Sequence, residues 1–323
     1  MGDLGNLGVR VFFVISGFLI TQLLIQECRT KGTISLSNFY LRRIFRIFPA
    51  FYVYLSAVAV LTGVGLISVR WSDLGYAAVY INNFVERKSW MVGHLWSLAV
   101  EEQFYLLWPF TILALGWRKS TLIVIGAVLV APILRVGCWY LMPGFRELIP
   151  KAFPTICDAI AIGCVLACLR DRLSHWSAYL RFTRSWAFLL IPLMILVSNA
   201  LGWHATRPDY LVGQSVRNIG IAMSLDWCIR YPNSMIGRFL NLRPMVWLGT
   251  LSYSFYLWQQ AFLNRLSDAV WCSFPLNISL AFAFAALSYF LIERQFLQLR
   301  SRLSQGAKQP GKHVIGGLET TPL

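Results

Sequence analysis

The segment His94–Pro109, HLWSLAVEEQFYLLWP, decides how this chain can fold, because it places Glu101 and Glu102 inside a stretch otherwise apolar enough to enter a bilayer. An ionised carboxylate there is costly unless it is paired or lines a water-filled cavity. Read as a helix, the segment gathers its polar and aromatic residues on one stripe: His94, Ser97, Glu101, Tyr105 and Trp108. Glu102 lies about 100° round from Glu101 on a helix of 3.6 residues per turn. A helix face of this kind is better suited to a functional site than to contact with lipid.

The composition of the whole chain is that of a membrane protein. Hydrophobic residues make up 57% of the 323 residues and charged residues only 13%, whereas about a quarter of a soluble domain is charged. The net charge of +15 does not indicate nucleic-acid binding, because the basic residues lie in short loops between apolar runs. The lipid bilayer is therefore the expected surrounding, and no nucleic-acid partner is expected.

The apolar runs predict an all-α, polytopic transmembrane helix bundle of about nine spans. A span needs about 20 apolar residues, and runs of that kind lie at 7–26, 47–67, 95–116, 120–141, 153–169, 186–203, 210–229, 245–263 and 276–293. The apolar piece 73–85 is too short to cross, so we expect a re-entrant or interfacial segment there.

Basic residues define an orientation for these spans. If 73–85 does not cross, most of the Lys and Arg fall in loops on one side, at 27–46, 117–119, 170–185 and 230–244 and after 293. Cytoplasmic loops carry this excess. The prediction is an N-terminus outside and a C-terminus inside, with Arg87 and Lys88 outside and Arg118 and Lys119 inside.

The central segment also resembles a known family. The strings WSL (96–98), EEQFYL (101–106) and WP (108–109) are similar to the signature of the acyltransferase 3 family, integral-membrane enzymes that O-acylate extracytoplasmic sugars and related acceptors. Further similar pieces are spread over the chain: LGV (7–9), FFVISGFLI (12–20), RRIFR (42–46), Pro49, Asp158, Ala159, Gly163, Ser252, Tyr253, YLW (256–258) and Glu293.

The resemblance implies a domain organisation. We expect an acyltransferase-3-like transmembrane domain over 1–300, and a disordered cytoplasmic tail over 301–323, which is rich in Gly, Lys, Pro and Thr. The family pattern has ten spans, and its first helix carries an arginine and, eleven positions later, a histidine taken as the catalytic base. This chain reaches its Phe-Phe-Val-Ile-Ser-Gly segment by residue 17, so the expectation is an N-terminally truncated, catalytically weak or inactive form.

Three residues of the central segment are candidate catalytic groups. Glu101 and Glu102 begin a span on the outer side, where an acceptor hydroxyl could meet a general base. The structural alternative for each glutamate, an ion pair with Arg135 or Arg217, is equally compatible with the sequence. His94 is a third candidate base, although a single histidine at a helix entrance is more often a capping or loop residue.

A cytoplasmic arginine group is the candidate donor-binding site. Arg43 and Arg46 share a helix face and Arg42 adjoins them, so their guanidiniums could clamp a phosphate. By spacing alone, a positive-inside anchor is the simpler interpretation. The family resemblance favours acyl-CoA, whose phosphates would arrive from the cytoplasm.

The remaining site residues follow from the same resemblance, and the expected substrate-binding residues are Ser16, Trp96, Ser97, Tyr105 and Asp158. Arg217 shares a helix face with Gln214 and Asn218. An intramembrane Arg and Asp usually pair with each other or with a ligand, so Arg217 and Asp158 are possible partners.

Together these features predict a membrane-bound O-acyltransferase of the bacterial inner membrane. It would move an acyl group, expected to be acetyl, from acyl-CoA as co-substrate to a hydroxyl of an envelope polysaccharide, lipopolysaccharide or other extracytoplasmic glycolipid. No metal is expected. The alternative is a secondary transporter that uses the buried charges as an ion or substrate relay, although such proteins usually show paired repeats and none is visible in this sequence.

Overall fold

The structure is a computed structural model that describes residues 2–204, 209–264 and 267–306, and within these ranges it is helical throughout, without strands. The α-helices are α1 (Gly2–Lys31), α2 (Leu36–Gly63), α3 (Trp71–Ala78), α4 (Trp90–Gly93), α5 (Trp96–Leu141), α6 (Phe153–His175), α7 (Ser177–Arg184), α8 (Leu190–His204), α10 (Gln214–Arg230), α11 (Met235–Leu240), α12 (Arg243–Phe262), α13 (Leu276–Ser288) and α14 (Arg294–Gly306). Short 3-10 or π turns link them: η1 (Asn82–Phe84), η2 (Pro143–Phe145), η3 (Trp186–Leu189), η4 (Asp209–Gly213), η5 (Val270–Cys272) and η6 (Tyr289–Glu293).

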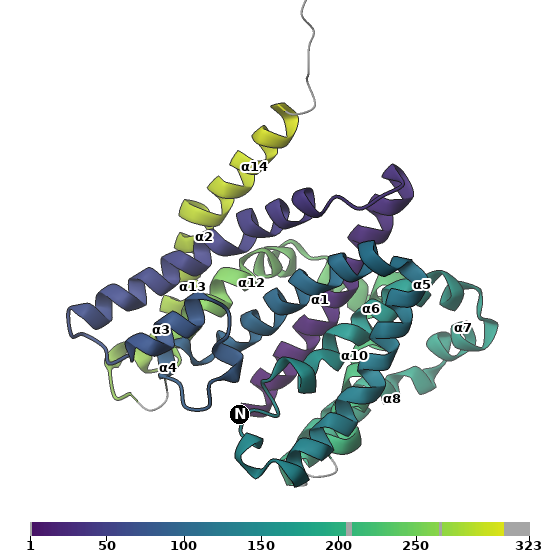
Figure 1. Cartoon of the computed structure of the whole chain (residues 1–323), viewed down its shortest axis with the longest axis horizontal. Coiled ribbons are helices and arrows are strands. Elements are labelled where there is room, and N and C mark those ends of the chain that lie inside the picture. Colours follow the sequence, from purple (N-terminus) through teal and green to yellow (C-terminus); the bar gives the residue numbers. More distant parts are fainter. Residues whose placement is uncertain (1, 205–208, 265–266, 307–323) are drawn as a thin grey trace, which may run out of the picture. The chain divides into compact units, whose positions relative to one another are not determined.

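The chain divides into two compact units. The first comprises residues 1–36 and 57–250, and the second comprises residues 37–56 and 251–323. In the first unit, α1 packs along α6, which also packs against α5 and α10 (Figure 1). Two glycines permit this packing: a Cβ on Gly17 would meet the backbone oxygen of Ile160, and a Cβ on Gly163 would meet that of Val14. Small residues serve this purpose where helices meet in membranes.

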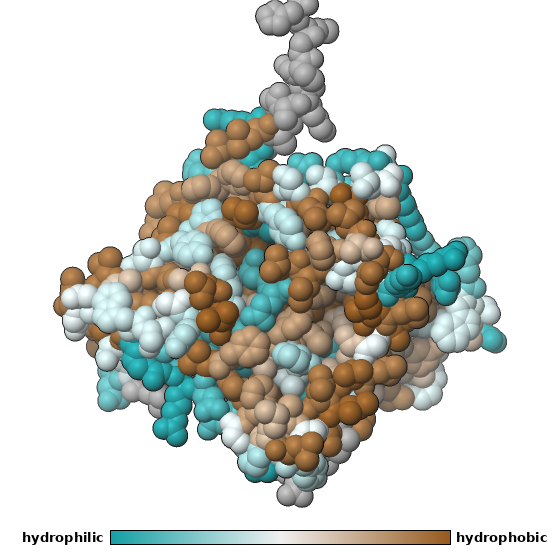
Figure 2. Space-filling view, in the orientation of Figure 1, coloured by the Kyte–Doolittle hydropathy of each residue, from teal (hydrophilic) through white to brown (hydrophobic). Residues whose placement is uncertain are grey.

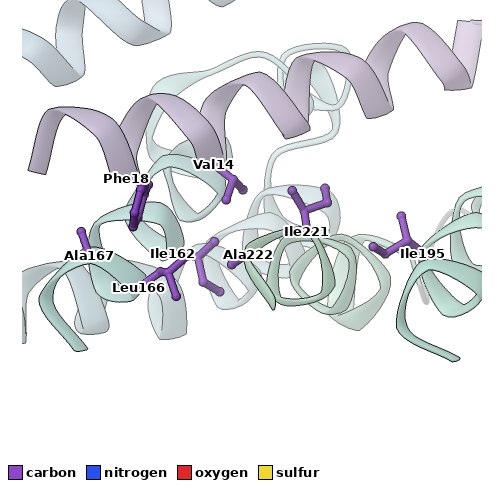
Figure 3. Packing of buried hydrophobic residues seen from close by; sticks show 8 residues of the cluster. All are labelled: Val14, Phe18, Ile162, Leu166, Ala167, Ile195, Ile221 and Ala222. Carbon is purple, nitrogen blue, oxygen red and sulfur yellow. The ribbon is translucent and has the colours of Figure 1, made fainter. Parts of the chain in front are cut away.

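Apolar side chains from four helices fill the space beside that crossing. Figure 3 shows Val14 and Phe18 of α1 above residues of α6, α8 and α10. The lower residues of this cluster are Ile162, Leu166, Ala167, Ile195, Ile221 and Ala222. The cluster fixes the four helices that carry most of the buried polar groups described below.

Helix α5 is interrupted at Gly116. This residue has φ 72° and ψ 167°, far from helical values, so residues 96–115 and 117–141 form two legs that meet at a sharp bend (Figure 1). Glycine occupies that conformation without the steric penalty that other residues meet. The two legs correspond to the predicted spans 95–116 and 120–141.

The second unit is held together by contacts between α2, α12, α13 and α14. The Tyr253 hydroxyl donates to the carbonyl of Ile47 at 2.8 Å, and Tyr54 meets Trp258 edge-on with ring centroids 5.3 Å apart. The Ser254 hydroxyl bonds to the Glu293 carboxylate. The first two contacts therefore join α2 to α12, which lie about 200 residues apart in the sequence.

The prediction of about nine spans is not confirmed. Among the described residues, five helices are long and apolar enough to cross a membrane, or six if the bent pair 177–184 and 186–202 counts as one span. The five are Leu4–Lys31, Leu36–Gly63, Trp90–Leu141, Phe153–His175 and Leu276–Leu303, and Trp90–Leu141 contains both legs of α5, which were predicted as two spans. The predicted spans 210–229 and 245–263 are absent from this set because α10 carries Gln, Arg, Asn and Asp, and α12 carries Ser, Thr, Tyr and Gln.

Two other expectations concern short segments. Residues 73–85 form only α3, of eight residues, and the three-residue turn η1, which agrees with a segment too short to cross. The tail predicted over 301–323 is only partly described: α14 continues as a helix to Gly306. Residues 307–323 lie outside the described part of the chain.

The outer surface is that of a protein surrounded by lipid. Figure 2 shows hydrophobic side chains over much of the drawn face. On α5 alone, Leu106, Phe110, Leu122, Leu129 and Ile133 each expose more than half of their surface. Soluble monomers rarely expose contiguous apolar patches of this extent, so the chain is a multi-pass membrane protein.

Candidate functional site

The central segment is anchored by the loop that precedes it. The side chain of Asn82 donates to the carbonyl of Val92 at 2.8 Å, just before α5. Gln103 on the first leg of α5 donates to the Tyr80 carbonyl at 2.9 Å and exchanges amide hydrogen bonds with Asn83. These bonds fix the start of α5 against the short segment around η1.

The stripe predicted for this segment is buried. Ser97, Glu101, Tyr105 and Trp108 are each at most 4% exposed, whereas Glu102, one step round the helix, is partly exposed. The helical spacing therefore identified correctly the face that turns inward.

Two hydrogen bonds join this stripe to α1. The hydroxyls of Ser16 and Tyr105 lie 2.5 Å apart, and the Trp108 indole donates to the Thr21 hydroxyl at 2.9 Å. Trp96 meets Phe13 edge-on, with ring centroids 6.1 Å apart. Three predicted substrate-binding residues, Ser16, Trp96 and Tyr105, thus lie at the contact between α1 and α5.

His94 lies in the turn between α4 and α5. Its side chain is 9% exposed, and its carbonyl accepts from the backbone amide of Ser97 at 3.3 Å and from the Ser97 hydroxyl at 3.5 Å. This is the turn position that the simpler interpretation gave it. Its part in catalysis stays a prediction.

A cavity of about 220 Å³ opens beside the start of α5 in the first unit. Its polar wall comes from α1, η4 and α10, and Trp96 forms part of the apolar wall. The residues that matter for its chemistry are Arg10, Trp96, Asn199, Asp209, Gln214 and Arg217. Arg10, Gln214 and Arg217 are each at most 6% exposed, so their polar groups face this small space rather than bulk solvent.

Behind the cavity lies a fully buried ion pair. Arg135 and Asp158 are both 0% exposed, with guanidinium nitrogens 3.0 and 3.1 Å from the carboxylate oxygens. Asp158 also accepts from Ser215 and Asn218, each at 3.1 Å. Asp158 thus binds Arg135 rather than Arg217, and its predicted contact with substrate stays a prediction.

Arg217 is paired with a different carboxylate. It donates two hydrogen bonds to Asp209, and a third to the Ser198 carbonyl at 2.9 Å. The structure therefore gives Arg135 and Arg217 an aspartate each. An ion pair with Glu101 or Glu102 stays the alternative to a catalytic role for those residues.

Sequence reasoning missed Arg10 as a site residue. It lies within α1, is 6% exposed and donates to the Asn218 side chain at 3.3 Å. The signal was present, because an arginine inside an apolar run is a functional-site hypothesis by default. Asp209 was missed because it lies at the edge of a predicted span.

The loop before α4 contains a lysine with an unusual environment. Burial, together with repulsion from Lys151, lowers the pKa of Lys88 to about 7, and its ammonium nitrogen makes no hydrogen bond among the described residues. Nearby Asp73 is 1% exposed and accepts from both the amide and the hydroxyl of Ser89. Although burial opposes it, hydrogen bonds from Ser89 and Arg70 hold the pKa of Asp73 below its usual value.

The predicted donor-binding arginines lie in the second unit. Arg46 is exposed, Arg42 and Arg43 are half-buried, and the Arg43 guanidinium lies 5.7 Å from the ring centre of Phe39. Arg46 is close enough to Glu293 for the two charges to interact. The side chains therefore remain accessible to a ligand while their helix is anchored.

The structure adds a fourth member to this arginine group. Phe45 on α2 meets Phe296 on α14, with ring centroids 6.4 Å apart. Arg300 is one helical turn beyond Phe296 and interacts electrostatically with Arg42, Arg43 and Arg46. No sequence signal links residue 300 to residue 42, because only the packing of α14 on α2 brings them together. These four residues are called the arginine cluster below.

Comparison with known proteins gives one family. The sequence model of the "acyltransferase domain" family matches residues 3–293. The match includes all predicted site residues and ends before Arg300. No solved structure matches the chain.

Several curated proteins are similar over most of this chain. A Bacillus subtilis strain 168 protein named "Putative peptidoglycan O-acetyltransferase" is 27% identical over 90% of this chain and 50% of its own length. A Staphylococcus aureus strain COL protein named "Putative O-acetyltransferase" is 30% identical over 90% of this chain and 52% of its own length. An O-acetyltransferase of Staphylococcus aureus strain NCTC 8325 is 29% identical over 79% of this chain and 45% of its own length. The chain therefore spans about half the length of the curated relatives it matches.

Proposed function

Because this chain belongs to the acyltransferase 3 family, we propose that it transfers an acetyl group from acetyl-CoA to a hydroxyl of an extracytoplasmic glycan or glycolipid of the cell envelope. The match of the family model over residues 3–293 carries this proposal. The names of the relatives support acetyl as the group and, for one of them, peptidoglycan as the acceptor. The bacterial inner membrane is the compartment that fits this activity.

The proposed reaction is an acyl transfer in which a base removes the proton of the acceptor hydroxyl. The hydroxyl oxygen then bonds to the thioester carbonyl carbon, the carbon–sulfur bond breaks, and the CoA thiolate leaves and takes up a proton. Glu101, Glu102 and His94 are the candidate bases. Glu101 is favoured because it is 2% exposed and lies on the inward face beside Ser97 and Tyr105, where a proton acceptor is shielded from bulk water.

The arginine cluster suits the donor. CoA carries a diphosphate and a separate phosphate, and guanidinium groups bind phosphate oxygens bidentately. Arg42, Arg43, Arg46 and Arg300 come from two packed helices, so they can contact phosphates from more than one direction. The comparisons give no support to the transporter alternative, because every similar protein named above is an acetyltransferase by name.

The proposal is tested with the full chain in lipid nanodiscs, labelled acetyl-CoA and cell-wall glycan fragments. We expect CoA release together with label on the glycan, and loss of both in Glu101→Gln. If neither CoA nor labelled glycan is formed, the proposed activity is wrong for this chain.

The donor site has its own test in acetyl-CoA binding. We expect Arg46→Ala to weaken binding about tenfold, which is roughly 1.4 kcal/mol, and Arg46→Lys to recover only part of it, because a point charge loses the bidentate geometry. Arg172→Ala, which removes an exposed arginine from the last turn of α6, is the control and should leave binding unchanged. Equal affinities for all four proteins would show that the cluster is only a surface anchor.

A further inference from the structure

Among the residues that the structure describes, the lining of the cavity in the first unit contains two arginines and one aspartate. Of the charged residues that line it, Asp209 is already bound by Arg217. Arg10 is 6% exposed, and its one hydrogen bond among the described residues is to the neutral side chain of Asn218. Asp158 accepts from Asn218 and is close enough to act on Arg10 electrostatically, but Arg135 binds its carboxylate in a two-bond pair. The lining thus carries one positive charge in excess.

Uncompensated polar groups of other kinds face the same space. The Gln214 side-chain oxygen and the Arg217 Nε are buried and make no hydrogen bond to the described part of the protein. Both residues line the cavity. A buried cation without a counter-charge is costly within a membrane-spanning helix, and buried polar groups without partners cost further free energy. A ligand that brings one negative charge and further hydrogen-bonding groups would satisfy all of them.

We propose that this cavity binds an acidic sugar ring of the acceptor, with Arg10 as the group that recognises its carboxylate. The cavity, at about 220 Å³, is below the roughly 300–1,000 Å³ typical of drug-sized ligands, so it suits one ring rather than an oligosaccharide. Trp96 offers an apolar wall for a ring face, and Gln214 and Asn199 offer hydrogen bonds to hydroxyls. The inference rests on the proposed function and names the substrate class of that site.

A carboxylate fits the charge of the lining better than a phosphate monoester does. A carboxylate brings one negative charge, which equals the excess in the lining, whereas a phosphate monoester brings about −1.5 to −2 at neutral pH. The planar guanidinium of Arg10 can bind both oxygens of that carboxylate, as guanidinium groups also do with phosphate oxygens. Arg10 would therefore bind the carboxylate, and the neutral lining residues would contact the hydroxyls and the face of the ring.

The test is direct binding to the purified full chain in nanodiscs, with glucuronate, its neutral analogue glucuronamide, and acetate as probes in calorimetry. Glucuronate should bind at least tenfold more tightly than glucuronamide and than acetate. Equal binding of glucuronate and glucuronamide, or no binding of glucuronate, would overturn the proposal. Acetate binding as tight as that of glucuronate would overturn the assignment to a sugar, since the carboxylate alone would then be recognised.

Two variants place the effect at Arg10. Arg10→Gln should remove the preference for glucuronate over glucuronamide, and Arg172→Gln, a change at an exposed arginine, should keep it. A preference that survives in a folded Arg10→Gln protein would overturn the role of Arg10. If Arg10→Gln does not fold, the comparison of the three probes on the wild-type chain still decides the substrate class. Acetyl transfer to neutral glycans with no preference for glucuronate would refute this inference while supporting the proposed function.

Discussion

Asp158 shows at the scale of single residues what the buried charges require. It is 0% exposed and binds Arg135, which is also 0% exposed. We predict that Asp158→Asn lowers the free energy of unfolding by about 3–5 kcal/mol, because it removes the carboxylate that binds the buried Arg135 cation through two hydrogen bonds. The measurement is thermal or denaturant unfolding of the purified chain in detergent.

Two further variants serve as controls for Asp158→Asn. Asp171→Asn breaks an Arg–Asp pair whose side chains are 66% and 73% exposed, and should change stability by less than about 1 kcal/mol. Replacing Arg135 by Met and Asp158 by Leu together should recover much of the loss, because no uncompensated charge remains. A double variant as unstable as Asp158→Asn would show that the hydrogen bonds to Ser215 and Asn218 matter more than the charge.

Lys88 makes stability depend on pH. Its pKa is about 7 in the folded protein and 10.5 in an unfolded chain, so between these values the unfolded state binds more protons. The penalty for burying its charge is fully present below pH 7 and disappears as the pH rises towards 10.5. We therefore predict that the melting temperature of the wild type rises between pH 6 and pH 9 relative to that of Lys88→Gln. A constant difference between the two proteins would contradict the lowered pKa.

At the scale of elements, the crossing of α1 and α6 depends on glycine. A Cβ at position 17 would fall against the backbone of Ile160, which cannot rotate away as a side chain can. We predict that Gly17→Ala destabilises the protein by about 1–3 kcal/mol, the usual cost of overpacking. Gly126→Ala in α5 is the matched control, because nothing lies within 4 Å of its added methyl group. Equal unfolding midpoints for the two variants would show that the helices separate at no cost.

The buried face of α5 could be predicted from the sequence, but not all of its partners. The spacing of His94, Ser97, Glu101, Tyr105 and Trp108 sufficed to predict the buried face of α5, because a helix places such residues on one side. The partners of that face, Ser16 and Thr21, are some 90 residues earlier. The family resemblance included Ser16, but Thr21 had no signal in the sequence.

At the scale of the whole molecule, the orientation in the membrane is the main open prediction. Because 73–85 forms only short helices, Arg87 should lie outside and Lys119, beyond the first leg of α5, should lie inside. In a cysteine-free background, Arg87→Cys should react with a membrane-impermeant thiol reagent added from outside. Lys119→Cys should react only after the membrane is opened. The reverse pattern would overturn the assignment of sides.

The number of membrane spans could not be predicted from composition alone. Hydropathy alone suggested nine spans, yet the structure has five helices that are both long and apolar enough, or six with the bent pair, among its described residues. The difference lies partly in α10, whose Arg217, Asn218 and Asp226 are buried in protein. A polar helix can be stable at such a place because neighbouring helices satisfy its charges.

The sequence by itself determined the class of the protein, its helical content, the family and the inward face of the central segment. These follow from composition and from the local period of the helix, which depends only on residues a few positions apart. The tertiary structure alone decided which charges pair: Arg135 with Asp158 and Arg217 with Asp209. It also placed Arg300 beside Arg42 and left Arg10 without an ion pair in the described part of the chain. Pairing depends on how helices far apart in the sequence pack against each other, and the spacing of residues within one sequence does not indicate which helices do so.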